Sequence, residues 1–330
     1  MDSWSKNDYI PFIINHFLIF LATSIIGTFI TIRTNSWWIG WLGMEINLLG
    51  FIILLINNSN ESSLKYFVVQ SLRSVILISS ALLTENFTFK KLELLIILAL
   101  FFKLGTAPLH FWLPIIVENI TNYQLIFLLT WQKIAPLYLI FSLPNQDISI
   151  LFIISSLIIG AFRSLNELRI FTLITFSSIN HTGWILISML RNELISILYI
   201  IVYTFLILSI LLPINDKNRQ TIWSLKNSNK YIIFINLLSL AGLPPFTGFL
   251  IKWILLSEIY LLTNSIVNLT LILTSIILLY FYLRITINRF FKNALYILSF
   301  NKNKQENTIT FRIVNLTRLY IILICVISII

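Results

Sequence analysis

The stretch Leu92–Pro114, LELLIILALFFKLGTAPLHFWLP, is a long apolar run that carries Lys103 and, five residues later, Pro108. It is long enough to cross a hydrocarbon core of about 30 Å, which needs roughly 20 helical residues. Because proline lacks an amide hydrogen and clashes with the carbonyl four residues earlier, we expect the helix to open near Pro108. An ionisable group at this depth is by default a candidate for function.

The composition of the whole chain also indicates that it lies in a lipid bilayer. Its 330 residues are 58% hydrophobic and 11% charged, with a mean hydropathy of +0.90. A water-soluble globule of this composition would expose more apolar surface than water tolerates. A membrane barrel would instead show short alternating segments. We therefore predict an all-α polytopic membrane protein.

About eleven apolar segments are predicted to cross the membrane. These segments are Ile10–Ile32, Trp37–Ile56, Leu64–Leu83, Leu92–Leu113, Thr121–Phe141, Ile148–Phe162, Leu168–Leu190, Leu194–Leu212, Tyr231–Leu262, Ile266–Ile287 and Thr310–Ile330. The polar stretches between them are too short to fold as separate domains. We predict surface loops at Asn57–Ser63, Asn215–Lys230 and Phe291–Asn307.

We expect a single membrane domain over residues 1–330. Within it, the first half-channel repeat covers about 37–141, the second about 148–287, and a C-terminal helix about 310–330. Twelve Lys and Arg residues fall on the N-terminal side of the predicted helices and four on the other. This bias places the N-terminus on the positive-inside face, and an odd number of crossings places the C-terminus on the opposite face.

Several chemistries are not expected. The single cysteine, Cys325, permits no internal disulfide and no cysteine-ligated iron–sulfur cluster. His16, His110 and His181 lack metal-ligand spacing, and the sequence has no nucleotide-binding glycine motif. Its basic residues are spread over loops instead of forming one patch. We therefore expect this chain to bind no redox cofactor, no metal and no nucleic acid.

A second helix break is predicted in AGLPPFTGFLIK, Ala241–Lys252, which contains Pro244 and Pro245. Both breaks read as Gly-x-x-Pro followed by an aromatic residue and Leu, and each has a lysine nearby. Paired broken helices in corresponding halves are a mark of inverted-repeat transporters, whose unwound backbone lines a hydrated path. The pattern therefore favours an antiporter-like fold with two broken helices.

Four ionisable residues lie inside predicted helices: Glu45, Lys103, Lys133 and Lys252. They point to a proton or ion path. Lys133 would instead extend to the membrane surface if its helix were shifted by a turn or two, but it lies about twelve residues into its segment, near the centre. From its spacing alone, His181 reads as a hydrogen-bonded packing histidine.

Five motifs then occur in an order that identifies a family. They are WLGMEIN (41–47), KLGTAPLHFW (103–112), LTWQKIAP (129–136), SSINHTGW (177–184) and GLPPFTGF (242–249). On these motifs the chain resembles the antiporter-like subunits of respiratory complex I, in particular the subunit 2 family of mitochondrial NADH dehydrogenase. The resemblance runs from about Trp37 to Leu262.

The resemblance implies a proton-translocating membrane-arm subunit that relays protons while redox chemistry occurs elsewhere in the complex. It implies that Glu45 pairs with Lys103, that Lys133 is the central relay lysine, that Lys252 is the terminal lysine and that His181 links the half-channels. NADH, FMN, iron–sulfur clusters and ubiquinone would belong to other parts of the complex.

By the same resemblance, the partners would be other membrane-arm subunits, especially subunits 4L and 4, and membrane lipids. The location would be the mitochondrial inner membrane, with the N-terminus in the matrix and the C-terminus in the intermembrane space. The same features suit a stand-alone cation/proton antiporter and, more remotely, a membrane-embedded transferase that uses Lys and His. A transferase would need an acidic or metal-ligand cluster, which the sequence does not display.

Overall fold

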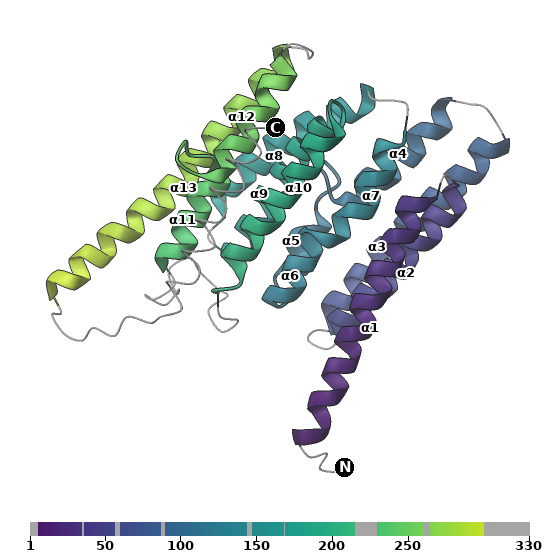
Figure 1. Cartoon of the computed structure of the whole chain (residues 1–330), viewed down its shortest axis with the longest axis horizontal. Helices are drawn as coiled ribbons and strands as arrows, with labels where there is room; N and C mark the ends of the chain where they lie inside the picture. Colours follow the sequence, from purple (N-terminus) through teal and green to yellow (C-terminus); the bar gives the residue numbers. More distant parts are fainter. Residues whose placement is uncertain are drawn as a thin grey trace. The chain divides into compact units, whose positions relative to one another are not determined.

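In the computed structural model the described residues are 6–34, 36–56, 60–86, 90–143, 147–167, 169–214, 230–260 and 265–299. All regular elements within these ranges are helices (Figure 1). They are α1 (Lys6–Arg33), α2 (Trp37–Ile56), α3 (Asn60–Asn86), α4 (Lys90–Leu104), α5 (Trp112–Val117), α6 (Asn122–Leu129), α7 (Trp131–Phe141), α8 (Asp147–Asn166), α9 (Ile170–Met189), α10 (Glu193–Leu211), α11 (Lys230–Ala241), α12 (Thr247–Tyr260) and α13 (Ser265–Ser299). The predicted helix at 310–330 lies outside the described residues.

Seven helical segments of the described chain are long and apolar enough to cross a membrane. They belong to α2, α3, α6 with α7, α8, α9, α10 and α13. The predicted all-α membrane fold is confirmed, but the predicted number of eleven crossings is not. One reason is that α4 with α5 and α11 with α12 are broken into halves, each shorter than a full span.

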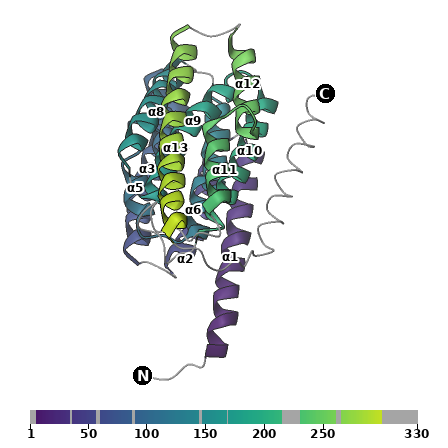
Figure 2. The ribbon, with the colours of Figure 1, turned by 90° about the vertical axis from the view of Figure 1, so that its left-hand side faces the viewer.

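The chain forms two compact units, Met1–Phe152 and Ile153–Ile330. In the first unit α2 packs between α1 and α3, α3 packs against α4, and α7 contacts α1, α2 and α4. In the second, α10 contacts α9, α11 and α12, while α11 and α12 follow one another along α13 (Figure 2). Each unit therefore contains one of the two broken helices.

Helix α9 is the most enclosed element of the second unit. All of its residues from Ile170 to Ser188 are buried, including several serines and threonines. The hydroxyl groups of this helix donate to carbonyls one turn earlier, as Ser177 does to Ile174 at 2.8 Å. A helix that is buried on all sides needs its polar groups satisfied in this way, since no water reaches them.

Glycines bring α1 and α2 into close contact. A Cβ at Gly43 would lie 2.7 Å from the carbonyl oxygen of Gly27, and one at Gly27 would lie 2.6 Å from the carbonyl oxygen of Gly43. Small residues are common where membrane helices meet, because packing there is driven by van der Waals contact. This contact places the middle of α2, including Glu45, at a fixed position in the first unit.

The predicted crossing Thr121–Phe141 is confirmed as one span, Asn122–Phe141, but it contains an interruption that was not predicted. At Thr130, φ and ψ of −114° and −76° separate α6 from α7. Two predicted loops are partly helical. The loop predicted at Phe291–Asn307 is helical as far as Ser299, because no Gly or Pro ends α13 before that point. In the loop predicted at Asn57–Ser63, residues from Asn60 onward belong to α3.

We expect the substitution Gly43→Ala to destabilise the protein by about 1–3 kcal/mol, because the added methyl group overpacks the contact between α1 and α2. The measurement is the temperature at which detergent-solubilised protein loses its monodisperse peak on size exclusion. Gly40→Ala is the control, because its Cβ would make only an ordinary 3.4 Å contact with Leu139. Equal midpoints for the two variants would contradict this prediction.

Candidate functional site

The first unit holds an ion pair between α2 and α4. Lys103 Nζ donates to Glu45 Oε1 at 3.2 Å, and the two side chains are 6% and 23% exposed. Removing one partner of a buried pair leaves an uncompensated charge and is strongly destabilising, typically by about 3–5 kcal/mol. The pairing that the family resemblance implied for Glu45 and Lys103 is thus present as a direct contact.

Lys103 lies in the last turn of α4, immediately before the first helix break. Gly105 adopts a φ of +71°, and its amide donates to the carbonyl of Phe102. A side chain at this position would collide with Leu113 as well as strain the backbone. The chain therefore leaves α4 in a tight turn, and Lys103 comes from the last turn of that helix, where a positive charge is favoured.

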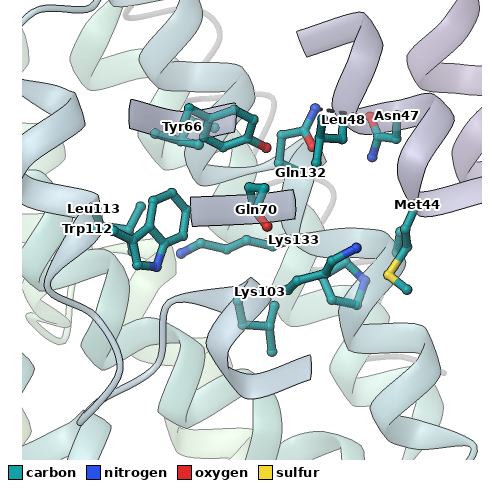
Figure 3. Close-up of a pocket in the computed structure, with 14 residues that line it drawn as sticks. Met44, Asn47, Leu48, Tyr66, Gln70, Lys103, Trp112, Leu113, Gln132 and Lys133 are labelled. Atoms are coloured by element: carbon teal, nitrogen blue, oxygen red, sulfur yellow. Dashed lines mark hydrogen bonds between the residues drawn. The ribbon is translucent and has the colours of Figure 1, made fainter. Parts of the chain in front are cut away.

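Two lysines of the first unit, Lys103 and Lys133, line the same small cavity (Figure 3). Lys103 and Lys133 contribute to its wall together with Gln70 and Gln132, and its volume is about 30 Å³. A water molecule needs about 10–15 Å³, so this space can hold one or two. In Figure 3, Lys133 extends beneath Gln70 toward Trp112. The cavity can therefore connect the two lysines through water.

The start of α7 positions Lys133. The hydroxyl of Thr130 donates to the carbonyl of Ile126, and the Lys133 amide donates to the carbonyl of Thr130, so that α7 restarts two residues before Lys133. Gln132 donates to the Asn47 side chain at 3.0 Å, which ties α7 to α2. Lys133 is 5% exposed. This low exposure agrees with a position near the centre of its segment.

In the second unit, Lys252 forms hydrogen bonds across the second helix break. Its ammonium group donates to the carbonyls of Leu240 and Ala241, at 3.2 and 3.1 Å, which are the last carbonyls of α11. Gly242, with a φ of +92°, ends that helix. Carbonyls at a helix end lack intrahelical partners and carry partial negative charge. Lys252, on α12, therefore supplies the hydrogen bonds that the broken helix lacks.

Aromatic residues connect the environment of Lys252 to His181. The Lys252 ammonium lies 5.6 Å from the ring centroid of Trp184, and Trp184 stacks on Tyr199 with 6.5 Å between centroids. The Tyr199 hydroxyl and His181 Nδ1 share a hydrogen bond of 2.8 Å. His181 therefore has the hydrogen-bonded environment that its sequence context predicted.

The predicted site residues thus gather in two places, Glu45, Lys103 and Lys133 in the first unit and His181 with Lys252 in the second. The predicted helix breaks at Pro108, Pro244 and Pro245 all fall between helices, as expected.

Sequence reasoning missed the part played by Trp184, Tyr199 and Gln132. A usable signal was present for one of them: Tyr199 and Tyr203 are four residues apart and share one face of α10, toward α9.

Comparison with known proteins identifies the family. The sequence family described as NADH:quinone oxidoreductase/Mrp antiporter, TM, matches residues 81–279. NADH-ubiquinone oxidoreductase chain 2 of Anopheles gambiae is 40% identical over 293 residues, which are 83% of this chain and 86% of the relative. This chain belongs to the NADH-ubiquinone oxidoreductase chain 2 family.

Solved structures share the fold. A chain of respiratory complex I from Thermus thermophilus superposes with a TM-score of 0.72 at 21% identity, over 82% of this chain and 70% of that one. A chain of an Mrp complex from Dietzia superposes with a TM-score of 0.67 at 16% identity, over 81% and 59%. The antiporter-like fold predicted from the paired helix breaks agrees with both.

The substitution Gly242→Ala should destabilise the second helix break by about 1–2 kcal/mol. The reason is that a non-glycine residue at a φ of +92° is strained and its Cβ would lie 3.3 Å from Lys252 Cδ. Thermal midpoints in detergent, again with Gly40→Ala as the control, measure the effect. A Gly242→Ala midpoint equal to that of the control would mean that this turn tolerates side chains.

Tyr199→Phe should destabilise the protein by about 1–3 kcal/mol, because the ring stack on Trp184 is kept while His181 loses the hydroxyl partner of a buried nitrogen. The matched control is Tyr123→Phe, which removes a hydroxyl from a side chain that is 62% exposed. Thermal midpoints that fall by the same amount in both variants would argue against a role for this hydrogen bond.

Proposed function

We propose that this chain is a proton-translocating membrane-arm subunit of NADH:ubiquinone oxidoreductase. It relays protons through Glu45, Lys103, Lys133, His181 and Lys252, driven by redox chemistry elsewhere in the complex, and binds no redox centre of its own. NADH, FMN, iron–sulfur clusters and ubiquinone are held by other subunits in this proposal.

The observation that carries the proposal is the shared cavity of Lys103 and Lys133, with Glu45 bonded to the first of them. A relay needs a donor and an acceptor that water can join, and a neighbour whose movement changes the charge state of one of them. Membership of the chain 2 family supports the same reading.

The energies involved are of the right size. Moving one proton against roughly 150–200 mV costs about 3.5–4.6 kcal/mol. Drawing a carboxylate from far away to about 4 Å from a lysine changes the energy by roughly 4 kcal/mol at an effective dielectric of about 20. Opening and closing the pair of Glu45 and Lys103 can therefore drive a proton from Lys103 toward Lys133, and from there to Lys252.

The same proposal includes the location, orientation and partners of the chain. The chain lies in the mitochondrial inner membrane, with its N-terminus in the matrix and its C-terminus in the intermembrane space. Its partners are other membrane-arm subunits of the complex, especially subunits 4L and 4, and membrane lipids. The excess of basic residues on the predicted N-terminal side supports this orientation.

A stand-alone cation/proton antiporter is the second candidate, because the matching sequence family and one structural neighbour include Mrp antiporter chains. Reconstitution separates the two functions. An antiporter exchanges Na⁺ or K⁺ for protons when the chain is alone in vesicles, whereas a complex subunit is inert there and copurifies with NADH-oxidising activity.

The substitution Lys133→Met should abolish most proton translocation while the complex still assembles. Removing a positioned proton-transfer group slows its step by about 10²–10⁴-fold, so we expect pumping to fall by about tenfold or more. The measurement is NADH-driven acidification of vesicles that contain the whole complex. Arg163→Met is the control, because Arg163 is an exposed residue of α8. Unchanged pumping in Lys133→Met would refute the relay.

A further inference from the structure

An arginine lies at the middle of α3 and takes no part in the relay described above. Arg73 is the fourteenth residue of the span Asn60–Thr84, which has 25 residues, and its side chain is 0% exposed. A guanidinium group remains charged at any physiological pH. At the centre of a membrane span such a group requires a compensating anion or a wet cavity.

Two aromatic rings cover the guanidinium group. Its Cζ atom lies 4.0 Å from the ring centroid of Phe102 and 4.5 Å from that of Trp112. Ring faces attract a cation. The N–H donors, however, lie in the plane of the guanidinium group and need acceptors at its edge. Nε, Nη1 and Nη2 of Arg73 have no such acceptor among the described residues.

The acidic residues near Arg73 along the chain are already engaged. Glu45 is bonded to Lys103. Glu61 is bonded to Lys65 at the start of α3, twelve residues before Arg73 and therefore about 18 Å away along the helix axis. The apolar segment 310–330, outside the described residues, contains no Asp or Glu. Among the described residues, therefore, no Asp or Glu bonds Arg73, and its N–H donors are available to an anion from another molecule.

Arg73 also lines an apolar groove on the surface of the first unit. The groove has a volume of about 650 Å³ and lies between α3 and α5. Leu64 and Phe111 in its wall are 64% and 63% exposed, and Val68 and Ile115 are more than half exposed. Phe102 lines the groove too and is only partly buried, so a rotation of its ring opens Arg73 to an incoming side chain.

A lipid does not supply what is missing. Acyl chains can fill an apolar groove, but phosphate groups lie about 15 Å from the centre of the hydrocarbon core, which is where Arg73 lies. A carboxylate at this depth can be carried only by a protein helix. We propose that the groove between α3 and α5 receives a transmembrane helix of another protein chain, whose Asp or Glu pairs with Arg73.

This inference rests on the proposed function, because it requires that the chain works inside an assembly. The pair is a fixed contact between subunits, and it borders the relay, because Trp112 covers Arg73 and also lines the cavity of Lys103 and Lys133. A planar guanidinium binds a carboxylate with two parallel hydrogen bonds, which sets the angle and the depth of the incoming helix. The pair therefore determines the register of the partner helix as well as its presence.

The test uses the whole complex with Arg73→Lys and a membrane-permeable carbodiimide. The reagent activates a buried carboxylate, an adjacent amine displaces the resulting urea, and an amide bond remains. We expect mass spectrometry to find position 73 joined to an Asp or Glu in a transmembrane helix of another chain. Arg73→Met supplies no amine and is the negative control. The pair of Glu45 and Lys103, 3.2 Å apart, is the internal positive control.

A second readout is the fraction of the chain found in the assembled complex, which we expect to fall by about tenfold in Arg73→Met and to be kept in Arg73→Lys. The inference is overturned if position 73 joins an acid of this same chain, if it joins no chain while Glu45 joins Lys103, or if Arg73→Met assembles normally. Any of those results can be obtained while the complex still shows normal NADH-driven pumping and Lys133→Met abolishes it. In that case this inference fails and the proposed function stands. If the chain is absent from any NADH-oxidising complex, both proposals fail.

Discussion

The central physical constraint in this chain is the cost of keeping ammonium groups away from water. The structure meets it in two ways. Lys103 has a carboxylate, Glu45, at 3.2 Å, and it also lies at the carbonyl end of α4. Among the described residues, Lys252 has no carboxylate partner; it donates to two backbone carbonyls at the end of α11 and lies over the ring of Trp184. For Lys252 the interrupted helix therefore supplies the partial negative charge.

The interruptions therefore do more than bend the chain. An unbroken membrane helix uses all of its interior carbonyls, so it has none to offer to a side chain. Gly105 and Gly242, both at positive φ, end the first halves of the two broken helices. At the second break the last carbonyls of α11 accept hydrogen bonds from Lys252. At the first break Gly105 and Thr106 donate to the carbonyls of Phe102 and Phe101, and Lys103 is bonded to Glu45 instead.

The sequence predicted what is encoded locally and missed what depends on packing. The breaks at Pro108 and at Pro244 with Pro245 were predictable because a missing amide hydrogen acts wherever the chain goes. The interruption at Thr130 was not, since no glycine or proline lies there and the restart of α7 depends on local hydrogen bonds and on Gln132 bonding to Asn47 of another helix. The pair of Glu45 and Lys103 came from the family resemblance. The spacing of Tyr199 and Tyr203 places both on one face of α10, but it does not say that His181 of another helix is the partner of Tyr199.

The restart of α7 at Trp131 has an electrostatic consequence for the direction of charge movement. Lys133 lies in the first turn of its helix, at the positive end of the helix dipole, whereas Lys103 lies in a last turn, at the negative end. Helix ends of this kind contribute about 0.3–1 kcal/mol each. An extra positive charge in their common cavity is therefore more stable near Lys103 than near Lys133. The two populations differ by roughly a factor of three to thirty. The two ends of the cavity therefore differ in electrostatic potential. In the resting state the charge has a preferred position, and only an external input can move it from there.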